Sequence, residues 1–174
     1  MTRRPRPVPV GLVGRPVWTA LVVLLAATTC WPLAGGPASA ATTTPVPVCQ
    51  VASKVTSLVV SRAVASNPTT FSFPRRTVVD SAKAARSVAG ALCALPRIPR
   101  GPIACPDDVG PTYTLGFVAA GHDVTKLTLD PTGCEVVHGL SGIRWIEQSP
   151  KFWRVLGAAM GLASPSQATF AGGR

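Results

Sequence analysis

The sequence of 174 residues predicts an α+β domain: an antiparallel sheet of about four to five strands with one helix packed on it, a C-terminal helix and two disulfide bonds. Apolar residues alternate with other residues over 113–117 and again over 125–129, which is typical of two paired strands. A separate run, residues 81–95, carries apolar residues at helical spacing. Four cysteines follow the N-terminal leader, which is typical of a small exported chain.

Residues 1–40 show the three-part pattern of a secretory signal peptide. Arginines precede an apolar stretch at 17–27, and small residues end the leader, so we expect cleavage after Ala40. A retained membrane anchor needs roughly 20 continuous apolar residues, whereas this stretch is interrupted at Thr28 and Thr29. We therefore expect a secreted protein, with membrane contact only through the uncleaved signal peptide.

The charge of the mature chain is positive but dispersed. Removing the four arginines of the leader leaves 13 of the 17 Lys and Arg residues against 7 Asp and Glu, a formal charge of +6. The cations stand singly or in pairs, as in Arg75–Arg76 and at Arg97 and Arg100, and no basic run is interleaved with aromatic residues. The expected partner is therefore an extracellular protein or a cell-wall component, and not a nucleic acid.

The first part of the mature chain predicts two strands. Residues 41–48 are rich in Thr and Pro, so we expect a disordered lead-in there. Residues 55–64 form a β-branched run with Leu58 and Val60 on one face. Residues 70–74 predict a short second strand, with residues 75–79 as an irregular extension. A turn cluster that includes Asn67–Pro68 separates the two.

A helix is expected next, with Asp80 as its cap and Pro96 beyond its end. Its apolar residues, three and four positions apart, make one stripe: Ala84, Val88, Leu92 and Leu95. Gly90 interrupts this run at a cost of about 1 kcal/mol against alanine. We therefore expect the helix to approach a strand closely at Gly90.

A proline-rich loop, residues 96–102, leads from the helix to a three-strand meander. The hairpin of residues 113–129 has its corner near Gly121. Residues 130–133 have Asp first, Pro second and Gly last, the order that a type I turn favours. The third strand should therefore start at Cys134.

The C-terminal part predicts a helix capped by Ser149, with Pro150 at its first position. Phe152 and Trp153 give this helix an apolar face. Together with Trp145 they are candidates for a binding surface, but their spacing is more typical of core packing. Residues 143–146 predict either a brief strand or an approach to this helix. The sequence thus predicts a single disulfide-stabilised domain over residues 49–162, followed by a disordered tail over residues 163–174.

Strand direction predicts how the cysteines pair. The first and third strands of an antiparallel meander run the same way, so Cys105 and Cys134 lie at the same end of the sheet. A bridge between them leaves Cys49 to pair with Cys93 in the helix. A bridge from Cys93 to Cys105, closing the proline-rich loop, stays open as an alternative.

The sequence offers no pattern for catalysis, metal binding or a cofactor. His122 is expected at a hairpin tip and His138 at a strand end, and no predicted route brings either histidine to a serine and a carboxylate. The cysteines lack the close spacing of zinc ligands. Asp107 and Asp108 are far short of the six to eight oxygens that calcium requires. We therefore expect a protein that is not an enzyme.

Two stretches resemble known secreted proteins. CPDDVGPTYTLGF and LDPTGCEVVHGL look like the uncharacterised exported proteins of actinobacteria. In addition, ARSVAGALCAL, then Cys105–Pro106 and Cys134–Glu135, resemble the subtilisin-inhibitor family in their order. That second resemblance implies a rigid loop after Cys-Pro that a protease binds as it binds a substrate. The specificity position would be Asp107, whereas subtilisin-type proteases usually prefer apolar or basic residues there.

Two functions are therefore expected. The first is a secreted or cell-envelope-associated, non-catalytic binding module. The alternative is a protease inhibitor that uses the loop after Cys105. In both cases the candidate interaction residues are Pro106, Asp107 and Asp108.

Overall fold

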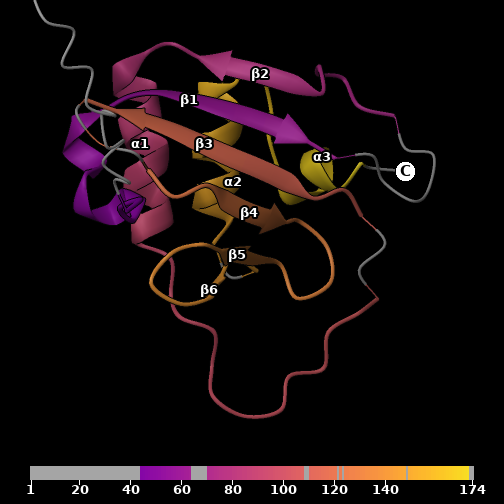
Figure 1. Cartoon of the computed structure of the whole chain (residues 1–174). Helices are drawn as coiled ribbons and strands as arrows, with labels where there is room; N and C mark the ends of the chain where they lie inside the picture. Colours follow the sequence, from indigo (N-terminus) through magenta and orange to yellow (C-terminus); the bar gives the residue numbers. More distant parts are fainter. Residues whose placement is uncertain are drawn as a thin grey trace, which may run out of the picture. The chain divides into compact units, whose positions relative to one another are not determined.

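We describe the protein from a computed structural model, which covers residues 44–63, 70–107, 110–120, 122, 124–147 and 149–172. The predicted signal peptide lies outside these residues. Within them, one antiparallel sheet has the strand order β2-β1-β3-β4-β5-β6 (Figure 1). The predicted α+β class is confirmed, with slightly more strands than expected. The strands are β1 (Val55–Arg62), β2 (Arg76–Val79), β3 (Tyr113–Ala119), β4 (Leu127–Asp130), β5 (Val136–His138) and β6 (Arg144–Trp145).

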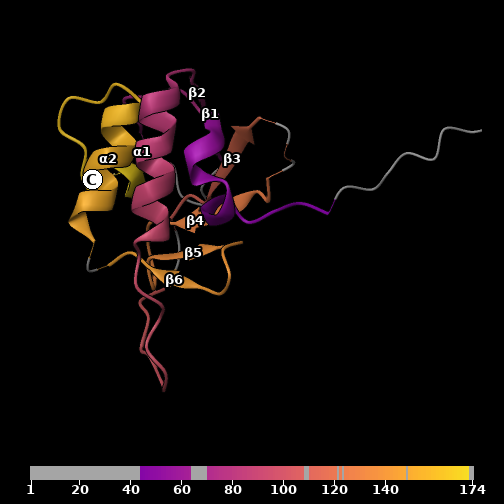
Figure 2. The same ribbon diagram turned by 90° about the vertical axis from the view of Figure 1, so that its left-hand side faces the viewer.

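The chain enters the sheet at β1, which lies between β2 and β3. Helix α1 (Ala82–Cys93) connects β2 to β3, and the strands from β3 to β6 follow one another as a meander. Figure 2 shows α1 beside α2 (Pro150–Ala159) on one face of the sheet. Two short 3-10 helices, η1 (Val48–Gln50) and η2 (Ala52–Lys54), precede β1 and contact α1.

The core lies between the sheet and its helices. Leu58 of β1 pairs with Phe117 of β3, and Val60 pairs with Leu115, and all four side chains are buried. The intervening residues point to the other face, where Val118 is 51% exposed. The predicted alternation of β1 and β3 is therefore confirmed.

The predicted second strand is wrong over residues 70–74, which form no strand, whereas its expected extension over residues 75–79 contains β2, Arg76–Val79. Phe71 and Phe73 precede it and pack their rings edge to face, with centroids 5.7 Å apart. The guanidinium carbon of Arg62 lies 3.4 Å from the ring centroid of Phe71, and this cation–π contact holds the segment against β1. Aromatic side chains here form a packed cluster in place of a strand.

Helix α1 begins one residue later than expected. Its N-cap is Ser81, whose Oγ accepts a hydrogen bond from the Ala84 N–H at 3.3 Å, so the predicted cap at Asp80 is wrong. The buried stripe contains Val88 and Leu92, as predicted. This stripe packs α1 against β1 and α2.

The prediction that Gly90 allows close approach to a strand is also wrong. Gly90 is exposed, and a Cβ atom at this position would meet nothing within 4 Å. Packing against the described residues therefore does not require a glycine at this position of α1.

We expect Gly90→Ala to raise the free energy of unfolding by about 0.5–1 kcal/mol, because alanine restricts the unfolded chain and favours the helix. Gly157→Ala in α2 is the matched control, since its Cβ would overlap the ring of Pro165 and should destabilise the fold. Urea unfolding of both variants measures the two effects. Equal destabilisation by both substitutions would contradict the finding that a Cβ atom at Gly90 would meet nothing within 4 Å.

Both expected ends of the domain are corrected. The described part of the lead-in is fixed, since Val46 forms a parallel bridge with Val124 and Val48 is fully buried. The expected disordered tail contains helix α3 (Gln167–Ala171), whose Phe170 is fully buried. Contacts with distant residues hold both ends in place. The local sequence of either end does not predict these contacts. The folded unit therefore reaches beyond residues 49–162 in both directions.

Candidate functional site

The two predicted disulfide bonds are confirmed. Cys105 is bonded to Cys134, with Cα atoms 4.8 Å apart, and Cys49 is bonded to Cys93, with Cα atoms 5.6 Å apart. The alternative bridge from Cys93 to Cys105 is therefore excluded. Two disulfide bonds suit an oxidising, extracellular environment.

The bond between Cys105 and Cys134 closes one end of a long loop between α1 and β3. Figures 1 and 2 both show this loop projecting from the sheet and helices. Its other end is held at β6. There the backbones of Arg97 and Arg144 form an antiparallel β-bridge, and the Trp145 N–H donates to the Pro96 carbonyl at 2.9 Å. We call residues 98–107 the tethered loop, because both of its ends are fixed to the folded domain.

The tethered loop makes few contacts of its own. Only Ile98 forms a backbone hydrogen bond within the part of the chain that the structure describes, donating to the Ile143 carbonyl at 3.5 Å. Pro99, Pro102 and Pro106 each fix one backbone torsion, so the segment is stiff without internal hydrogen bonds. The chain bends at Arg100 and Gly101, and Gly101 has a φ of 119° that favours glycine. The loop is thus an exposed, stiff and doubly anchored segment.

The predicted interaction residues lie at one end of this loop. Pro106 and Asp107 are exposed directly after the bridged Cys105. Asp108 lies outside the described residues. Sequence reasoning missed the opposite arm, residues 98–104, although its two prolines and one glycine (Pro99, Pro102 and Gly101) already indicated a stiff segment.

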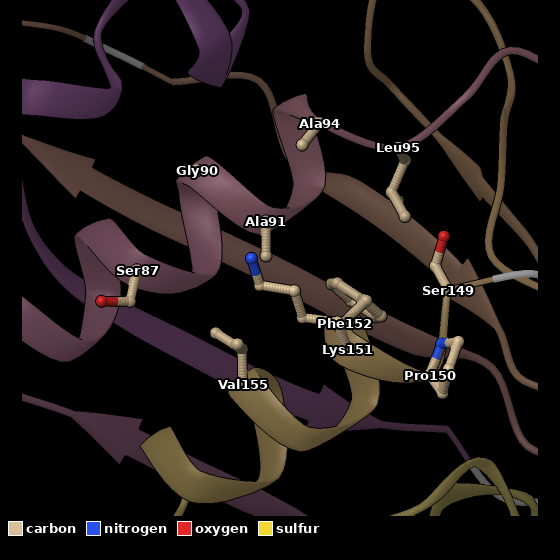
Figure 3. Close-up of a pocket in the computed structure, with 10 residues that line it drawn as sticks. All are labelled: Ser87, Gly90, Ala91, Ala94, Leu95, Ser149, Pro150, Lys151, Phe152 and Val155. Carbon is tan, nitrogen blue, oxygen red and sulfur yellow. The ribbon is translucent and has the colours of Figure 1, made fainter.

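A groove between α1 and α2 is a second candidate. Its cavity volume is about 560 Å³, and Figure 3 shows side chains of both helices facing it. Ala91, Leu95, Phe152 and Val155 give it an apolar lining, and Lys151 supplies the one charged side chain among the lining residues described. Gly90 keeps part of the wall open. The groove lacks converging polar groups, so it has the character of an apolar contact surface and not of a catalytic pocket.

A third region surrounds Glu135, next to the bridged Cys134. Its cavity of about 230 Å³ is lined by Glu135, Glu147, Trp153 and Arg154, among others. Burial raises the pKa of the Glu135 carboxyl, the negative charge of Glu147 raises it further, and a hydrogen bond from the Trp153 side chain opposes part of this rise. Glu135 also has a φ of 46°, which explains why β5 starts at Val136 and not at Cys134 as predicted.

Replacing this carboxyl should change how stability depends on pH. Between the ordinary and the raised pKa of Glu135, the folded protein binds more protons than the unfolded chain, so its stability falls as pH rises. We expect Glu135→Gln to be more stable than the wild type above the raised pKa, and the difference to shrink towards acid pH. Thermal unfolding across pH measures this, with Glu147→Gln expected to give a partial effect. Parallel stability curves for Glu135→Gln and the wild type would contradict the raised pKa.

The two histidines lie apart and have different neighbours. His122 Nε2 is 3.1 Å from Lys54 Nζ, whereas His138 Nε2 is 3.7 Å from Asp130 Oδ2, and Asp130 Oδ1 also accepts a hydrogen bond from Thr112 at 2.9 Å. No group of three or more His, Cys, Asp or Glu residues that could hold a metal ion occurs in the described ranges. The absence of enzymatic activity stays a prediction.

The C-terminal aromatic residues belong to the core. Phe152 and Trp153 are 1% and 2% exposed, with ring centroids 5.3 Å apart. This confirms the expectation of core packing for these two residues, whereas Trp145 in β6 is half-buried. Ser149 stands at the N-cap of α2 and Pro150 at its first position, as predicted, but the Ser149 side chain makes no capping hydrogen bond.

Together these features define a class of protein: a disulfide-stabilised α+β domain that presents a tethered loop. No helix among the residues described here is long and apolar enough to span a membrane. No protein-family model matches the chain, and neither a curated protein nor a solved structure matches it.

Proposed function

We propose that the protein is a secreted or cell-envelope-associated binding module, which docks onto its partner through the tethered loop, residues 98–107. The observation that carries this proposal is that the loop is fixed at both ends. The Cys105–Cys134 disulfide bond holds one end, and the backbone β-bridge between Arg97 and Arg144 holds the other. Prolines and anchors restrict a loop before it binds, so less conformational entropy is lost in the complex.

The loop also leaves its backbone groups free for a partner. Arg100, Gly101, Ile103 and Ala104 carry N–H groups that make no hydrogen bond to another described residue. Such groups are satisfied by water in the free protein and can pair with the backbone of a bound protein. The loop therefore supports recognition by shape and main-chain pairing.

The experiment compares a loop variant with a groove variant. In the first, residues 99–104 are replaced by a Gly-Ser sequence of equal length. In the second, Ala94→Trp fills the groove between α1 and α2. Each protein is immobilised and incubated with culture supernatant and cell-wall fractions of the producing organism. We expect the wild type and the groove variant to retain the same partner and the loop variant to lose it. If the groove variant alone loses the partner, the binding surface is the groove and not the tethered loop.

A protease inhibitor is the second candidate, supported by the exposure of Asp107 directly after the bridged Cys105–Pro106 and by the resemblance to subtilisin inhibitors. Because Asp107 stands at the specificity position, an inhibitor of this kind should act on a protease that accepts acidic residues. Titration against subtilisin-like and acidic-residue-specific proteases tests this. No inhibition at micromolar excess, together with slow cleavage after Asp107, would exclude it.

A further inference from the structure

We infer that Arg100 is the residue through which the tethered loop holds its partner, and that the partner is an extracellular protein with an acidic cleft. This inference rests on the proposed docking function of the loop. It adds the chemistry of the partner and the side chain that recognises it.

Arg100 has no partner within the folded domain. It is exposed at the bend of the loop, and it makes no hydrogen bond, ion pair or ring contact with another described residue. Arg62 lies over the ring of Phe71, and Arg144 donates from Nη1 to the Leu95 carbonyl at 3.1 Å. Arg100 shares an exposed side chain without a described partner with Arg75, Arg76, Arg86, Arg97 and Arg154, and differs from them in its place at the bend of the tethered loop. The five N–H donors of Arg100 are therefore available to a ligand.

The backbone around Arg100 holds it outward. Pro99 and Pro102 restrict the chain on both sides, and the positive φ of Gly101 turns the chain directly after the arginine. A Cβ atom at Gly101 would meet nothing within 4 Å, so the bend stands clear of the rest of the described chain. An arginine presented in this way fits a concave surface on the partner.

The charge of the loop favours a protein over a polyanion. A polymer of regularly spaced negative charges is held by several cations on one surface, and its affinity grows with their number. The tethered loop has a single cation at its bend, with Asp107 further along, while Arg97 stands at its fixed base. One projecting arginine instead suits a pocket with a carboxylate, which binds the planar guanidinium through two parallel hydrogen bonds. Arginine is also enriched among the residues that dominate the affinity of protein interfaces.

The test uses photocrosslinking with the full chain secreted by the producing cells. A benzophenone amino acid replaces Ala104 in the loop, or Ala158 on the exposed side of α2 as the control position. Arg100→Glu is introduced beside each probe. Arg97→Glu serves as the matched variant with the same change of charge, because only the backbone of Arg97 forms the bridge to Arg144 and its side chain is exposed. Thermal unfolding confirms that the variants fold, as expected for exposed side chains.

We expect the probe at position 104 to form an adduct with one protein, through a peptide that carries Asp or Glu. Arg100→Glu should reduce this adduct at least tenfold, and Arg97→Glu less than twofold. Equal loss with both variants, no loss with Arg100→Glu, or an adduct with a cell-wall polymer would overturn the inference about Arg100. An absence of adducts at position 104 beyond those at position 158 would instead overturn the proposed docking function.

Discussion

Phe170→Ala should lower the free energy of unfolding by about 3–5 kcal/mol. Phe170 is fully buried, and its ring centroid lies 5.1 Å from that of Trp153 and 5.7 Å from those of Phe73 and Tyr113. Removing the ring leaves a cavity among three other aromatic side chains and releases α3 from the domain. Urea unfolding measures the loss, with the exposed Ala168→Ser in the same helix as the control.

Tyr113 provides an independent readout of the same packing. Its hydroxyl donates to the Phe170 carbonyl at 2.8 Å, and burial raises the pKa of Tyr113 to about 12, although Arg62 lowers it in part. Because Tyr113 is the one tyrosine of the sequence, ultraviolet absorbance reports its ionisation directly. We expect Phe170→Ala to bring this pKa down towards 10. A loss below about 1 kcal/mol with an unchanged tyrosine titration would contradict the packing of α3.

Replacing Cys49 and Cys93 together by serine should lower the free energy of unfolding by about 4 kcal/mol, according to the chain-entropy model for a separation of 44 residues. The bond joins η1 to α1 and so restricts the unfolded chain over the whole segment that contains β1 and β2. Chemical unfolding of the double variant and the wild type measures the difference. A loss below about 1 kcal/mol would mean that the unfolded chain gains little freedom when the bond is removed.

Local patterns were sufficient to predict much of this fold. The alternation around Leu115 and Phe117 follows from the period of a strand, and the stripe through Val88 and Leu92 follows from the period of a helix. The pairing of Cys105 with Cys134 could be predicted because strand direction alone places both cysteines at one end of the sheet.

Features that depend on distant contacts could not be predicted in this way. The segment around Phe170 is rich in small and polar residues, and a helix as short as α3 is unstable by itself. It exists because the ring of Phe170 enters a cluster formed by residues far away in the sequence. Likewise, the anchoring of the tethered loop at Arg97 requires β6, and two residues are too few to predict a strand securely.

The candidate site was predicted only in part. The bridged end of the loop, with Pro106 and Asp107, followed from the cysteine spacing. The exposure of Arg100 and the openness of the groove beside Gly90 depend on what surrounds these residues in space, which no local pattern specifies.

The dissociation constant of the partner complex, with and without the Cys105–Cys134 bond, tests most directly whether the tethered loop is the docking surface. The double variant Cys105→Ser/Cys134→Ser frees one end of the loop, and the chain-entropy model gives a stability loss of about 3.6 kcal/mol for its separation of 29 residues. The Cys49→Ser/Cys93→Ser variant is the matched control, because it is destabilised to a similar extent and keeps the loop anchored. We expect at least tenfold weaker binding from the first variant and unchanged binding from the second. Equal affinities for the wild type and both variants would contradict a docking role for the tethered loop.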